Sequence, residues 1–113
     1  MARPHGHVHE TALDIVPGTD MRAPGGAVTT GLCGHWDHDG PCRWPHHNDL
    51  DAGVAPSLLR TVFVCDDADE AEVRTRIDAA LLLSDAWSVH ASGPGELTAA
   101  ERATAARLAA GAR

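Results

Sequence analysis

The strongest constraint on the fold is a strand–helix–strand pattern in the C-terminal half of the chain. Residues 60–65 form a short β-branched and aromatic run without alternation, which is typical of a buried strand. Over residues 68–83, apolar side chains recur every four positions from Val73 to Leu81 and predict one apolar stripe on a helix. Residues 87–91 alternate and predict a second strand. We expect a βαβ unit with parallel strands and a right-handed crossover.

Two capping boxes are expected at helix starts. Asp67 stands three residues before Glu70 at the start of the predicted helix. After a Gly/Pro break at residues 92–95, Thr98 and Glu101 open a final helix that ends near Gly111.

The N-terminal half predicts a β-hairpin followed by a long loop. Residues 8–16 and 27–32 look like two strands joined by a Gly/Pro-rich connection. Residues 33–57 hold several Gly and Pro residues with little periodicity. A loop of this length inside a compact domain is usually functional or held by a bound group.

These elements predict one small α+β domain over residues 1–113, with residues 1–6 as a disordered tail. The hairpin and long loop precede a βαβα unit over residues 58–111. We expect a mixed sheet with its helices on one face.

The apolar content is poor in large side chains, since the chain has one Phe and no Tyr and much of the apolar fraction is alanine. A small domain of this kind benefits from a staple such as a bound metal. The segment from Cys33 to His47 offers one, because it holds six cysteine or histidine side chains among turn-forming residues. Thiolate and imidazole are the ligands that zinc prefers.

Cys33, His35, Cys42 and His46 form the preferred ligand set for this metal. His38 and His47 are substitutes for either imidazole, and Asp37 or Asp39 would orient imidazoles if the site is functional. Three other interpretations remain open: a disulfide between Cys33 and Cys42, solvated histidines without a metal, and a wholly structural zinc closed by four ligands.

Other histidine, cysteine and tryptophan residues are also candidates for a functional role. His5, His7 and His9 lie two residues apart, so an extended segment would point all three to one face, and His7 and His9 are possible additional ligands. His90 is expected to be structural or on the surface. Cys65 ends a buried strand and is expected to be an inert, buried thiol, because Asp66 and Asp67 oppose thiolate formation. Trp36 and Trp44 flank the ligands and would shield a metal from water.

Charge and cysteine content limit the partners. A formal charge of −7 argues against non-specific nucleic-acid binding, and no segment is apolar enough for a membrane span. No secretory signal is recognisable, so we expect a soluble cytoplasmic protein with reduced thiols.

The predicted function is that of a small zinc-binding accessory or interaction protein, with another protein as its partner. No lysine is present, which excludes a Schiff base, and no nucleophile–base constellation is apparent. Two alternatives stay open: a metal-dependent enzyme or enzyme subunit with an open site, and a sensor or carrier for copper, nickel or zinc.

Overall fold

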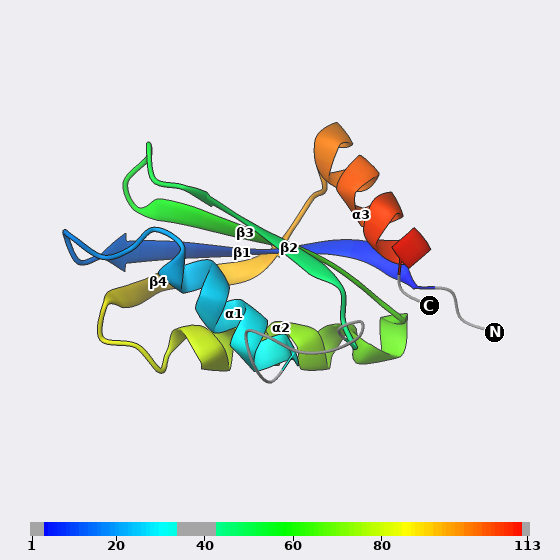
Figure 1. The fold of residues 1–113 in the computed structure, drawn as a ribbon, viewed down its shortest axis with the longest axis horizontal. Coiled ribbons are helices and arrows are strands. Elements are labelled where there is room, and N and C mark those ends of the chain that lie inside the picture. Colours follow the sequence, from blue (N-terminus) through cyan, green and yellow to red (C-terminus); the bar gives the residue numbers. More distant parts are fainter. Residues whose placement is uncertain (1–3, 34–42, 112–113) are drawn as a thin grey trace.

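The computed structural model describes residues 4–33 and 43–111 of the chain. These residues form an α+β domain with a four-stranded antiparallel sheet (Figure 1). None of the described helices is long and apolar enough to cross a membrane. The elements in chain order are β1 (His5–Ile15), α1 (Ala23–Cys33), β2 (His46–Asp51), β3 (Ser57–Cys65), a 3-10 turn (Asp67–Asp69), α2 (Glu70–Leu81), β4 (Trp87–Gly95) and α3 (Ala99–Gly111).

The strand order is β2-β3-β1-β4, and every neighbouring pair is antiparallel. The segments β1-α1-β2 and β3-α2-β4 are therefore two split βαβ units, each with a foreign strand inserted between its own strands. This connectivity is called ferredoxin-like. The prediction of β3, α2, β4 and α3 in sequence is confirmed, and β3 and β4 do run in the same direction. The expected mixed sheet is wrong, because β1 lies between these two strands and is antiparallel to both.

The predicted N-terminal hairpin is also wrong. Its first strand corresponds to β1, but residues 27–32 lie in helix α1. Val28 and Leu32 stand one turn apart on this helix, and both are buried in the core. Tertiary packing thus overrides the weak helix propensity of a segment rich in glycine and β-branched residues.

The long loop predicted for residues 33–57 contains an element that the sequence did not reveal. Residues 46–51 form β2, an edge strand paired only with β3 among the described residues. Its alternating burial was hidden, because Leu50 is its only aliphatic residue. Cys33 belongs to α1, not to the loop.

Helices cover both faces of the sheet, not one face as expected. Helices α1 and α2 pack together on the inner face, and α3 lies on the outer face (Figure 1). The inner core is the larger, and it contains Leu13, Val28, Leu32, Trp44, Leu59, Phe63, Cys65, Val73, Ile77, Leu81 and Trp87. The outer core contains Val8, Val62, Val64 and Ala105.

The two expected capping boxes have different outcomes. Thr98 and Glu101 form theirs reciprocally, with N–H···O distances of 2.9 and 3.1 Å. The box expected from Asp67 and Glu70 is wrong, since neither the 3-10 turn nor α2 has a side-chain cap. Residues 92–95 continue β4 instead of ending it, and Pro94 is tolerated because β4 is an edge strand.

Candidate functional site

The Cys/His segment runs between two anchored parts of the fold. Cys33 is half-buried in the last turn of α1 and packs against the inner core. On the other side, the Pro45 carbonyl accepts a 3.0 Å hydrogen bond from the Val64 amide, and His46 begins β2. The predicted ligands His35, His38 and Cys42 lie outside the described residues, as do Asp37, Asp39 and Trp36.

His46 is held in one tautomer by its two hydrogen bonds. Its Nδ1 lies 3.1 Å from the carbonyl oxygen of Trp44, which can only accept, so Nδ1 carries the proton. Its Nε2 lies 2.9 Å from Oγ1 of Thr29, and in the neutral ring with its proton on Nδ1 it is the acceptor of that hydrogen bond. A ring N–H donated to a backbone carbonyl is also how proteins orient a histidine whose other nitrogen binds a metal.

The contact with Thr29 brings His46 close to Cys33. Thr29 and Cys33 are four residues apart in α1 and so lie on the same face, one turn from each other. Of the preferred ligands, Cys33 and His46 are the two within the described residues. Cys33 lies in the last turn of α1, and His46 contacts the same face of this helix through Thr29.

Cys33 takes part in a disulfide in this structure. Cys65 is a free thiol. A disulfide sulfur is not the thiolate that zinc prefers, and a metal site that uses Cys33 therefore requires the reduced chain.

Cys65 is 4 % exposed and lies in the inner core, as expected for an inert thiol. Burial is the main reason that the pKa of this thiol rises to about 11, and the charges of Asp69, Glu70 and Asp66 contribute to the same rise. The missing thiolate makes Cys65 a poor nucleophile at neutral pH.

The substitute ligand His47 and the additional ligand His7 both lie apart from His46. His47 is exposed on the opposite face of β2. His7 shares a row with His46 across the sheet, but Phe63 stands between them because it pairs with both. Two strand spacings amount to about 10 Å, which is too far for one ion to bridge directly.

His7 and His9 are engaged with α2 instead. His9 Nε2 lies 2.8 Å from the Asp78 carboxylate, and its Nδ1 accepts from Arg74 at 3.1 Å. His7 stacks on Phe63 with its Nδ1 3.5 Å from Glu70, and burial lowers the pKa of His7. Within residues 4–33 and 43–111, no group of three or more potential ligands is arranged to hold a metal.

Trp44 is buried between two guanidinium groups. Those of Arg43 and Arg76 lie 4.4 and 4.9 Å from its ring centroid. This packing holds Trp44, whose carbonyl oxygen contacts His46. His90, by contrast, is exposed and lies 3.5 Å from Asp14, which confirms a surface position.

A polar network that was not predicted from the sequence joins α1 and β2. Asn48 donates to the Gly25 carbonyl at 3.2 Å and accepts from Thr61 at 2.8 Å. Thr29 belongs to the same seam through His46. These contacts could not be predicted, because residues 27–32 were expected to form a strand and not the helix that packs against β2.

No protein-family model matches the chain, and comparisons with curated proteins and with solved structures found no match.

Proposed function

We propose that the chain is a small metal-binding accessory or interaction protein whose Cys/His segment binds a transition metal, with zinc preferred, in the reduced state. Its ligands are Cys33, His35, Cys42 and His46. His38 substitutes for an imidazole, whereas His47 faces away from His46 on the other side of β2.

The orientation of His46 carries this proposal. Its proton is fixed on Nδ1 by the Trp44 carbonyl, so Nε2 presents a lone pair beside the face of α1 that also carries Cys33. Oγ1 of Thr29 contacts Nε2 at 2.9 Å, and this hydroxyl group turns away with a single side-chain rotation.

The disulfide at Cys33 makes metal binding in this proposal dependent on reduction of the chain, and such dependence suits reversible binding better than a permanent structural zinc. Disulfide and thiolate are mutually exclusive for this sulfur, so the oxidised chain lacks at least one ligand. The carrier or sensor function is accordingly the second candidate.

Metal titration of the reduced protein tests the proposal. We expect one Zn²⁺ per chain by elemental analysis, and Co²⁺ substitution is expected to give thiolate-to-metal charge-transfer absorption. Cys33→Ser and His46→Ala are expected to weaken Zn²⁺ binding by more than about 10–100-fold, the loss typical of removing only an orienting partner. The oxidised protein is expected to bind weakly.

Two matched variants are the controls. Cys65→Ala removes the buried free thiol, and His90→Ala removes an exposed imidazole; both are expected to retain full stoichiometry. Reduced protein that binds no metal and keeps its stability would contradict the proposal. It would leave a disulfide-stapled fold with solvated histidines.

A further inference from the structure

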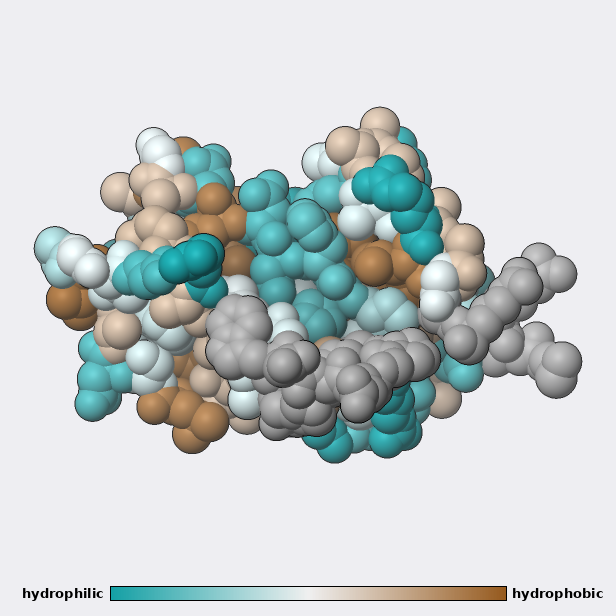
Figure 2. Space-filling model, in the orientation of Figure 1, coloured by the Kyte–Doolittle hydropathy of each residue, from teal (hydrophilic) through white to brown (hydrophobic). Residues whose placement is uncertain are grey.

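Helix α3 covers only part of the outer face of the sheet. It packs over Val8, Val62 and Val64 and leaves the far part of the central strands uncovered. There Ala12 and Leu58 are half-buried, although no helix lies on them in the described residues. Figure 2 shows the molecule hollowed between α3 and the connection from β2 to β3, with a hydrophilic surface in the hollow.

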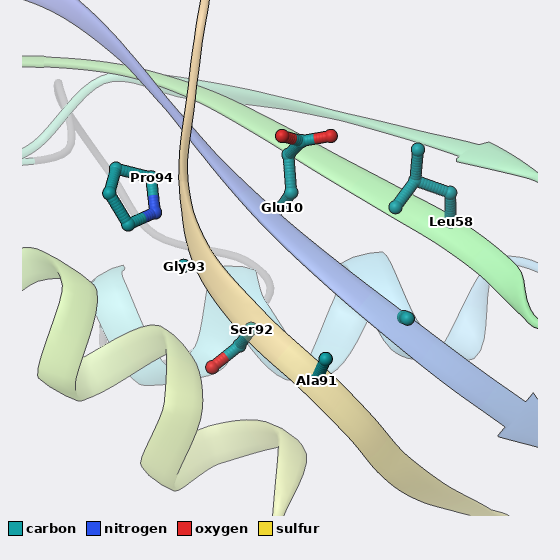
Figure 3. Close-up of a pocket in the computed structure, with 7 residues that line it drawn as sticks. Glu10, Leu58, Ala91, Ser92, Gly93 and Pro94 are labelled. Carbon is teal, nitrogen blue, oxygen red and sulfur yellow. The ribbon is translucent and has the colours of Figure 1, made fainter.

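This open face is the outer surface formed by Ala12, Leu58 and Ala91 together with Glu10, Asp14, Asp49 and Asp51. A shallow cavity of about 180 Å³ lies at its β1–β4 side, between Glu10, Leu58 and the Ala91–Pro94 stretch of β4 (Figure 3). Its lining is mostly apolar. Because a cavity of about 150 Å³ is large enough for benzene, this one accommodates one aliphatic side chain.

Glu10 lines the cavity, and further carboxylates lie on the same face of the sheet. Asp14, Asp49 and Asp51 are exposed, and strand alternation places them on the same face as Leu58. Asp49 is paired in register with Arg60, and Asp51 with Leu58.

The guanidinium on this face is already bound. Arg60 lies 2.7 Å from Glu10 and forms two bonds of 2.7 and 2.8 Å with Glu101. It also donates to the Glu96 carbonyl. Since one positive charge meets two carboxylates, this cluster is itself net negative.

We propose that the open face docks an extended segment of a partner protein, in which one aliphatic side chain is flanked by arginine or lysine residues. In an extended chain, residues two apart point to the same side. When an aliphatic residue occupies the cavity, cationic side chains two residues before and after it therefore point toward the carboxylates of the open face. Complementary charge of this kind steers association and fixes register.

A second copy of this chain is a less favourable partner for the open face than a basic segment. A two-fold contact through the open face would oppose the same carboxylates on both copies. The chain carries 16 Asp and Glu residues against 9 Arg, so its other surfaces supply few cations.

Peptide binding at low ionic strength tests the proposal. The probe is a fluorescein-labelled peptide, Arg-Ser-Arg-Ser-Leu-Ser-Arg-Ser-Arg, and its control carries Glu at each Arg position. We expect the basic peptide alone to bind, with amide chemical-shift changes confined to the outer-face residues of the four strands. Salt is expected to weaken binding.

Two variants locate the binding. The triple variant Asp14→Asn, Asp49→Asn, Asp51→Asn is expected to weaken binding about tenfold, since each exposed ion pair contributes modestly. Ala91→Trp fills the cavity without changing charge and is also expected to weaken it. The matched control, Asp67→Asn with Asp69→Asn and Asp85→Asn, removes three carboxylates elsewhere and is expected to change affinity by less than about threefold.

Three results would overturn the proposal. One is no binding of the basic peptide, and another is equal weakening by the triple variant and its control, which indicates a general charge effect. The third is a wild-type dimer in light scattering that dissociates in the triple variant, because it makes a second copy the occupant.

Discussion

Among single residues, Glu101 links α3 to the sheet through its bonds with Arg60. Its two oxygens bind the Arg60 guanidinium, and Oε1 also accepts from the Thr98 amide in the capping box. The side chain is only 16 % exposed, so solvent screens these contacts weakly. Hydrogen bonding from Arg60 is the main reason that the pKa of Glu101 falls to about 2.

This lowered pKa predicts an acid-sensitive contribution to stability. The carboxylate stabilises the fold above its ordinary pKa of 4.5, and that contribution is lost as the pH falls from about 4.5 toward 2. Glu101→Gln is expected to lower the free energy of unfolding at pH 7 by on the order of 2 kcal/mol. It is also expected to flatten the decline between pH 5 and pH 2, as measured by urea denaturation across this range.

Glu96→Gln serves as the control, because Glu96 is exposed and Arg60 is bonded to its backbone carbonyl, not its carboxylate. A Glu101→Gln protein with the wild-type pH dependence would show that another carboxylate governs acid unfolding.

Among the elements, those with a clear apolar period were predictable from the sequence. Val73, Ile77 and Leu81 mark α2 because their spacing is set by the helix itself, and all three are buried. The β-branched run of β3 is buried on both faces, which explains its continuous apolar pattern. Such local patterns do not specify which strands are neighbours, so the insertion of β1 between β3 and β4 was missed.

Helix α1 and strand β2 were missed because their stability comes from contacts distant in the chain. α1 contains three glycines and two threonines, and β2 has Leu50 as its only aliphatic residue. For the candidate site, residue types and spacing indicated Cys33 and His46. The contacts of His46 with Thr29 and Trp44 depend on the α1–β2 packing, which the sequence did not reveal.

Gly31 is a position at which α1 closely approaches α2. A Cβ there would lie 2.7 Å from the Cβ of Ala80 and 3.3 Å from the Arg76 carbonyl oxygen. Gly→Ala inside a helix normally stabilises by about 1 kcal/mol. Here the overlap costs about 1–3 kcal/mol and outweighs that gain, so Gly31→Ala is expected to be destabilising.

A double-mutant cycle distinguishes close packing from other causes. Ala80→Gly in the Gly31→Ala background removes the opposing methyl group and is expected to recover part of the lost free energy of unfolding. Chemical denaturation of the four proteins measures the coupling. Strictly additive effects would mean that the two helices do not press together at this point.

At the scale of the whole molecule, the sheet separates two cores of unequal size. The inner core includes Phe63 and two tryptophans, whereas the outer core holds three valines and Ala105. Ala105 is the one buried residue of α3 itself. The remaining apolar contacts come from half-buried residues such as Leu97 and Leu108.

This imbalance predicts that α3 opens before the rest of the fold. Hydrogen exchange in the native state reports local opening free energies, and these are low where few apolar contacts are buried. The amides of α3 are expected to exchange with a free energy at least about 1 kcal/mol below that of β1 and β3. Leu108→Ala is expected to increase this difference in opening free energy, because it removes an apolar contact by which α3 packs on the outer core. NMR-detected exchange at increasing denaturant measures both quantities. If α3 and β1 exchanged with one common free energy, the two cores would unfold as a single unit, and the unequal division of apolar contacts would not govern the order of opening.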